Sequence, residues 1–164
     1  MERQEIDDEL SGTGAHELLR SARLARLAYL GGDGTPRVIP VGFLWTGGQV
    51  VICTAATAPK VTSLSAGPDV ALTIDAGDTP AEARSVSIRG RAHVEIVDGV
   101  PDEYLAATAK ILDEEALAEF GRNCRALYDR MARITVTPRW ARYYDFSAGP
   151  VPKFLQDLAE RAHA

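Results

Sequence analysis

Residues 50–64 read VVICTAATAPKVTSL and form the most telling stretch of the chain. The apolar first half predicts a buried strand, and Pro59 suits the first turn of the short helix that follows. A helix start presents unpaired backbone N–H groups and the positive end of the helix dipole, which favour a phosphate group. The hydroxyls of Thr54 and Thr57 and the ammonium of Lys60 converge there, so the segment predicts a phosphate-binding corner. An ordinary strand-to-helix connection is the alternative on these residues alone.

Further strands are expected on both sides of this segment, because the apolar residues alternate and turn signals separate the runs. The expected strands span residues 24–30, 37–45, 49–55, 69–75, 85–97 and 133–146. Hairpin-linked strands with one short crossover helix and a late helical region do not form regular βαβ units. The pattern therefore predicts a mainly β fold, a small antiparallel barrel with peripheral helices.

The length of 164 residues predicts one domain, spanning residues 1–164. Residues 1–15 are expected to be an acidic, solvated lead-in. Residues 101–131 keep helical spacing and predict a helical insertion, and residues 150–164 predict a C-terminal helix.

Composition narrows the classes of partner and the compartment. The formal net charge is −5 and the basic residues are scattered, which argues against nucleic acid as a partner. No run of 18 apolar residues is present, so we expect no membrane-spanning segment. The first residues lack the pattern of a secretion signal, and Cys53 and Cys124 resemble the buried thiols of a reducing compartment. A cytoplasmic protein is therefore expected.

Few residues point to catalysis or to a metal. His16, His93 and His163 lie far apart in the sequence, so no metal site is expected. No acid–base pair is conspicuous, and catalytic residues stay unassigned. Pro40 and Gly42 share one side of their predicted strand, and glycine there often marks close approach by a ligand or another backbone.

Several short motifs follow one another along most of the chain. They are RLARLAYL at 23–30, DGTPR at 33–37, the Pro40-Val41 strand with Trp45, then Thr54 and Lys60, PDVALTID at 68–75 and IRGRA at 88–92. In this order, over roughly residues 18–146, the chain resembles the pyridoxamine 5′-phosphate oxidase-like family. The resemblance implies a split β-barrel of about six antiparallel strands and a homodimer. It also implies a flavin-type cofactor, FMN or the deazaflavin coenzyme F-420, at each subunit interface.

By position, the resemblance also implies the cofactor-binding residues. The strand along the flavin ring, which would act partly through its backbone, comprises Arg37, Val38, Ile39, Pro40, Val41 and Gly42. Thr54 and Lys60 would hold the cofactor phosphate, with Thr57 as a helper. Trp140 is a candidate wall for the cofactor of the partner subunit, and simple core or interface packing is the alternative for it.

The chain departs from the true oxidase in two places. Lys60 stands alone where the oxidase has an Arg-Lys pair, and no match to its substrate-phosphate arginines is found. The resemblance therefore implies a flavin- or deazaflavin-dependent oxidoreductase acting on a small organic molecule, and not oxidation of pyridoxamine phosphate itself. The alternatives are a protein that stores or senses flavin or haem without turnover, and a dimeric interaction module with an empty cleft. Arg89 and Arg91 stay open between a place near the cofactor and an exposed strand position.

Overall fold

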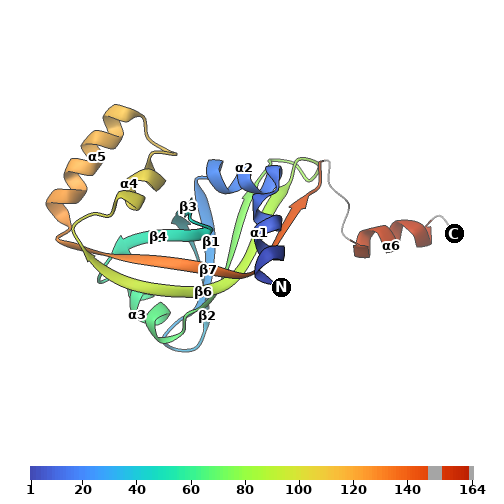
Figure 1. Ribbon diagram of the computed structural model, residues 1–164, viewed down its shortest axis with the longest axis horizontal. Helices are drawn as coiled ribbons and strands as arrows, with labels where there is room; N and C mark the ends of the chain where they lie inside the picture. Colours follow the sequence, from blue (N-terminus) through green and yellow to red (C-terminus); the bar gives the residue numbers. More distant parts are fainter. Residues whose placement is uncertain (148–152, 163–164) are drawn as a thin grey trace.

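The computed structural model describes residues 1–147 and 153–162, and Figure 1 shows its ribbon. Within these residues a single sheet forms the body of the protein and helices lie around it. The elements in chain order are α1 (Arg3–Ser11), α2 (Thr13–Ser21), β1 (Leu24–Leu30), β2 (Pro36–Gly42), β3 (Leu44–Thr46), β4 (Gln49–Ala55), α3 (Pro59–Ala66), β5 (Asp69–Ala76), β6 (Arg84–Asp98), α4 (Asp102–Thr108), α5 (Glu114–Leu127), β7 (Arg130–Asp145) and α6 (Lys153–Ala162).

The seven-stranded sheet has the order β2-β1-β5-β6-β7-β4-β3, and each neighbouring pair is antiparallel. Its two outermost strands, β2 and β3, are separated in the chain by Phe43 alone, so the sheet must curl until its edges approach each other. β2 also contacts β4 across this seam. Curling the sheet in this way shelters the strand edges. The predicted mainly β split barrel is confirmed.

The corner at Phe43 explains why the barrel has seven strands where about six were expected. We predicted one strand over residues 37–45, whereas the structure has β2 and β3 in its place. Phe43 is completely buried, and Ile39, Val41 and Trp45 face the core on the same side, as their alternation predicted. The chain therefore keeps its buried face but breaks the strand where it turns from one edge of the barrel to the other.

β6 and β7 are paired over their whole length except at one register shift next to Gly90. Arg89 lies opposite Trp140 and Gly90 opposite Pro138, which leaves Arg139 as the extra, bulged residue. A Cβ atom at Gly90 would collide with the backbone carbonyl of the facing strand, so only glycine fits there. Proline is tolerated at such an irregularity because no regular ladder hydrogen bond is required of it.

Helices α1 and α2 belong to the folded body. Ile6 and Leu10 of α1 are buried in the main core, and the helix packs on β7. The Glu9 carboxylate accepts a hydrogen bond from the backbone N–H of Tyr143 at 2.6 Å. The prediction of a solvated lead-in over residues 1–15 is therefore wrong. The abundant acidic residues of α1 obscured an apolar pair at helical spacing.

The later helices follow the prediction except at one boundary. The insertion predicted at 101–131 contains α4 and α5, but β7 already begins at Arg130, so Met131 is a buried strand residue. The predicted C-terminal helix corresponds to α6, and residues 150–152 and 163–164, including His163, lie outside the described residues. None of the described helices is long and apolar enough to cross a membrane.

Candidate functional site

The predicted phosphate corner is the connection between β4 and α3. Ala58, the residue before the helix, is extended and offers no side-chain cap, and the first turn of α3 contains no acid. Pro59 has no N–H, and the Val61 N–H already donates to the Ala58 carbonyl at 2.9 Å, so an anion at this end of α3 would meet the positive end of the helix dipole and the Lys60 side chain. Lys60 is half-buried, and its ammonium forms no hydrogen bond or ion pair within the described part of the chain. Thr54 is half-buried and Thr57 is exposed.

The predicted ring strand, β2, has two distinct faces. Val38 is 66% exposed, and Pro40 and Gly42 are also exposed, so these three residues form its outer face. Ile39 and Val41 face the core of the barrel. A cofactor on the outer face could therefore reach Ile39 and Val41 only through their backbone groups.

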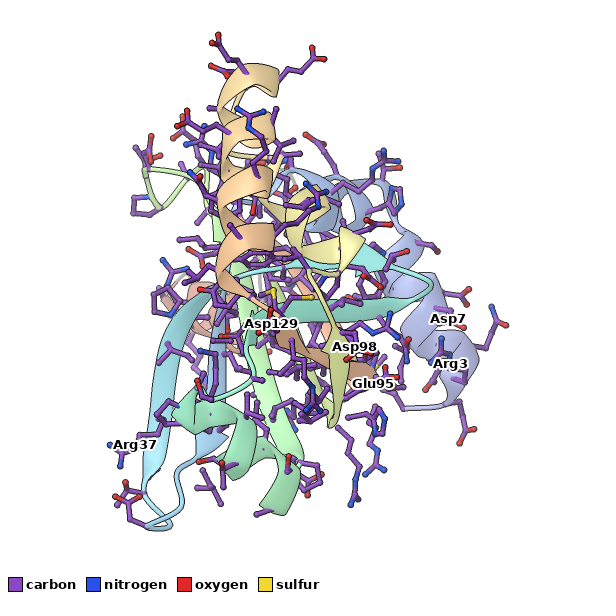
Figure 2. The ribbon with its side chains drawn as sticks, turned by 90° about the vertical axis from the view of Figure 1, so that its left-hand side faces the viewer. Arg3, Asp7, Arg37, Glu95, Asp98 and Asp129 are labelled. Carbon is purple, nitrogen blue, oxygen red and sulfur yellow. The ribbon has the colours of Figure 1, made fainter. Side chains whose placement is uncertain are left out.

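Arg37 lies near the tip of the β1–β2 hairpin. Its Nη2 atom is 2.7 Å from Oδ2 of Asp33, and both side chains are about half exposed. The pKa of Asp33 is lowered, chiefly because its carboxylate accepts hydrogen bonds from the hydroxyl and the backbone N–H of Thr35. In Figure 2 the Arg37 side chain points away from the barrel at this tip. The guanidinium can therefore contact a second molecule or subunit as well as Asp33.

One row of residues crosses the outer face of the sheet from β2 to β7. The pairings run from Val38 to Ala28, then to Ala71, Arg89 and Trp140. Residues directly opposite each other in neighbouring strands point to the same face of a sheet. The Arg89 guanidinium lies over the Trp140 ring, 4.1 Å from its centre. The row thus joins the predicted ring strand to the predicted aromatic wall within one subunit.

A cavity of about 590 Å³ opens on this face, and we call it the outer cavity. Small and apolar residues of β1, β2 and β5 line most of it, while Arg37, Arg89 and Arg139 supply cationic groups. Sequence reasoning left Arg89 unassigned and missed Arg139. The signal for Arg139 was present, since Pro138 inside a predicted strand indicates a local irregularity. Arg91 is exposed and lies opposite Asp69 and Thr137 in the sheet.

The predicted cofactor residues do not all line one cavity of the subunit. Arg37 and Val38 line the outer cavity, whereas Thr57 lines a second cavity of about 640 Å³ beside the end of α5. Asp129 and Arg130 border that second cavity, and Figure 2 shows Asp129 at the end of α5, well away from Arg37. Helix α3, which carries Lys60, contacts β1 and β6.

Burial keeps two titratable side chains near the phosphate corner, Cys53 and Tyr104, protonated at neutral pH. Burial raises the pKa of the Cys53 thiol to about 12, with a smaller contribution from Glu103, so the thiol stays protonated at neutral pH. Burial likewise raises the pKa of Tyr104. No set of His, Cys, Asp or Glu side chains in the described part of the chain is grouped to hold a metal ion. The site offers cations, hydroxyls and a flat apolar surface.

One family model matches a range of residues that includes every strand of the barrel. Residues 14–146 match the model for pyridoxamine 5′-phosphate oxidase. The chain belongs to the pyridoxamine 5′-phosphate oxidase-like family. This confirms the resemblance that the ordered motifs indicated. No curated protein matches the chain at a significant level.

Solved structures share the fold of this pyridoxamine 5′-phosphate oxidase-like protein. A conserved hypothetical protein, Rv2991 from Mycobacterium tuberculosis, is 20% identical with a TM-score of 0.62, covering 93% of this chain and 91% of its own. An F-420 reductase is 27% identical with a TM-score of 0.60, covering 77% and 94%. An FAD-binding protein from Mesorhizobium loti is 19% identical with a TM-score of 0.53, covering 80% and 90%.

Proposed function

We propose that this protein binds a flavin-type cofactor, FMN or coenzyme F-420, and uses it to oxidise or reduce a small organic molecule. The observation that carries the proposal is half-buried Lys60 at the acid-free start of α3, whose ammonium has no hydrogen-bond or ion-pair partner among the described residues. Membership of the family and the similarity to an F-420 reductase support the same class of cofactor.

The phosphate of the cofactor would lie at the start of α3. Lys60 would supply the positive charge, Thr54 and Thr57 would donate hydroxyl hydrogen bonds, and the positive end of the helix dipole would complete the seat. A hydrogen bond between charged groups contributes about 1.5–3 kcal/mol. Lys60 is therefore the residue whose loss should affect cofactor binding most.

The flat ring of the cofactor would lie against the outer face of β2. Val38, Pro40 and Gly42 offer a surface without long side chains, and Ile39 and Val41 contribute backbone groups only. Trp140, stacked under Arg89, provides an aromatic surface on the same row of the sheet. When bound, the cofactor supplies the hydride or electron-pair chemistry, and the protein binds it, orients it and excludes water.

A second copy of the chain would complete the site. Leu24, Leu30 and Val38 are 46%, 54% and 66% exposed and point to the same outer face of β1 and β2. Exposed apolar residues gathered on one face mark an interaction surface. A homodimer would cover this face and enclose the cofactor between subunits.

A non-catalytic flavin-binding protein is the second candidate. It is favoured by one observation: among the described residues that line the outer cavity, Asp69 is the only carboxylate and there is no histidine. Proton transfer to a substrate would then have to involve Asp69, a tyrosine or solvent.

The test begins with the absorption spectrum of the purified protein and titrations with FMN and with coenzyme F-420. Saturable binding of one of them supports the proposal, and failure of both to bind overturns it. Anaerobic reoxidation of the reduced, bound cofactor by candidate acceptors then separates the two candidates, since a storage protein shows no acceptor-dependent turnover. Sedimentation velocity with and without cofactor measures the dimer.

A further inference from the structure

Helices α2 and α4 both contact β3 at one end of the barrel (Figure 1). A third cavity, of about 430 Å³, is lined by residues of these elements, and we call it the end cavity. Helix α2 contributes His16 and Arg20, β3 contributes Trp45, and Lys110 follows the end of α4. It shares no lining residue with the outer cavity. Its volume falls in the range of small-molecule sites, roughly 300–1,000 Å³.

Lys110 is fixed at the wall of the end cavity. Its Nζ atom donates hydrogen bonds to the backbone carbonyls of Ala22, at 3.1 Å, and Phe43, at 2.9 Å. The same atom lies 3.8 Å from the centre of the Phe43 ring. These contacts orient the ammonium, but neither carbonyls nor a ring carry a net negative charge. Burial lowers the pKa of Lys110 to about 8 because no such charge offsets its desolvation.

Arg133 shows how this chain neutralises a cation elsewhere. Its guanidinium lies 2.8 Å from a carboxylate oxygen of Glu95 and 2.9 Å from one of Glu103. None of the described residues that line the end cavity is acidic. Glu17, next to His16 in the sequence, is paired elsewhere: its Oε2 atom lies 3.8 Å from Nη1 of Arg84. The end cavity therefore holds a positive charge without a counter-charge among the described residues.

The rest of the lining is suited to an organic body. Leu19, Leu44 and Ala106 are apolar, and Trp45 adds an aromatic surface. His16 and Arg20 lie four residues apart on α2 and so share a side of the helix. We propose that the end cavity binds a small organic anion, a carboxylate or phosphate ester with an aromatic or apolar body. Its charge lies beside Lys110 and Arg20 and its body against Trp45.

The two tryptophans of the chain allow a direct test on the full-length protein. In a Trp140→Phe background, Trp45 is the only tryptophan and reports on the end cavity. Benzoate and phenyl phosphate are titrated separately, to distinguish a carboxylate ligand from a phosphate ester. Benzyl alcohol serves as the neutral control, and sodium chloride as the control for ionic strength. We expect a saturable change in Trp45 emission with at least one of the two anions, and binding of benzyl alcohol at least about tenfold weaker.

Variants then assign the binding to the cavity. Lys110→Met keeps the apolar stem and is expected to weaken anion binding about tenfold or more. Arg20→Gln is expected to weaken it roughly threefold, because Arg20 is exposed. Arg122→Gln removes one exposed positive charge from α5, outside the end cavity, and should leave binding unchanged.

Two results would overturn the proposal. One is the absence of any saturable anion-dependent change in Trp45 emission. The other is equal affinity in the Lys110→Met, Arg20→Gln and parent proteins. If Lys110→Met does not fold, a His16→Gln, Arg20→Gln double variant decides, because both side chains are exposed and neither closes the core. Unaltered affinity of that double variant would exclude the site.

Discussion

Lys60 and Lys110 are both half-buried lysines, yet the fold places them in opposite surroundings. Lys60 stands at the start of α3 and has no protein partner among the described residues. Lys110 donates to two backbone carbonyls and lies on the Phe43 ring, so it joins the segment after α4 to the barrel corner. Partial burial alone therefore does not define the role of a cation. The hydrogen-bond and ion-pair partners of a cationic side chain determine whether it is available to bind a ligand, stabilises the fold, or does both.

The two faces of β2 also differ in their surroundings. Val38 lies on the exposed outer face, on the side proposed for cofactor and partner. Val41 lies in the core, two residues before the buried corner at Phe43. Substitutions in each region should therefore separate loss of binding from loss of folding.

The largest contrast is expected between two substitutions in β2. Val41→Glu buries an unpaired carboxylate and should lower the free energy of unfolding by at least about 3 kcal/mol. Val38→Glu should keep a cooperative urea-unfolding transition but weaken the dimer and the cofactor complex. Urea unfolding and sedimentation velocity measure the two effects. A Val41→Glu protein as stable as the parent would contradict the assigned faces of β2.

The next largest effect is expected from replacing Lys60, which should weaken cofactor binding. Lys60→Met is expected to raise the Kd of FMN or coenzyme F-420 roughly 10- to 100-fold, because one charge-assisted hydrogen bond to phosphate is lost. Its unfolding free energy should change by less than about 0.5 kcal/mol. Arg122→Gln is the matched control for loss of an exposed charge. Superimposable titration curves for Lys60→Met and the parent would refute the phosphate corner.

Replacement of Lys110 should instead lower the stability of the folded protein. Lys110→Met leaves the carbonyls of Ala22 and Phe43 without their donor, and should lower the free energy of unfolding by about 1–2 kcal/mol. Cofactor affinity should stay the same, because Lys110 lies outside the outer cavity. Chemical denaturation measures the change in unfolding free energy, and the FMN titration measures cofactor affinity. A larger effect on cofactor binding than on stability would reverse the assignment of the two lysines.

The last contrast concerns the pH dependence of stability. Burial lowers the pKa of Lys110 from 10.5 to about 8, so between these values the unfolded chain binds more protons than the native protein. This group therefore adds stability as pH rises from about 8 to about 10.5, and that contribution is lost as pH falls. The rise in unfolding free energy between about pH 8 and 10.5 should be seen in the parent protein and be absent from Lys110→Met. Parallel curves of unfolding free energy against pH would contradict it.

Much of the candidate site could be read from short-range patterns. Pro59 and the acid-free turn after β4 mark the start of α3, and the alternation around Val41 predicts which side of β2 is buried. The corner at Phe43 was missed because a strand break with a continuous apolar face leaves no trace in the alternation. Helix α1 was misread because its acids outnumber Ile6 and Leu10, the two residues that anchor it.

The period of each strand, the position of the crossover helix and the family motifs can all be read from the sequence, because they depend on neighbouring residues. The contacts of Lys110 with Ala22 and Phe43, and the position of Arg139 with Arg89 at the outer cavity, arise from the folded arrangement of the chain. Such contacts depend on how a curled sheet brings distant segments together. The periodicity of a single strand or helix carries no information about that closure.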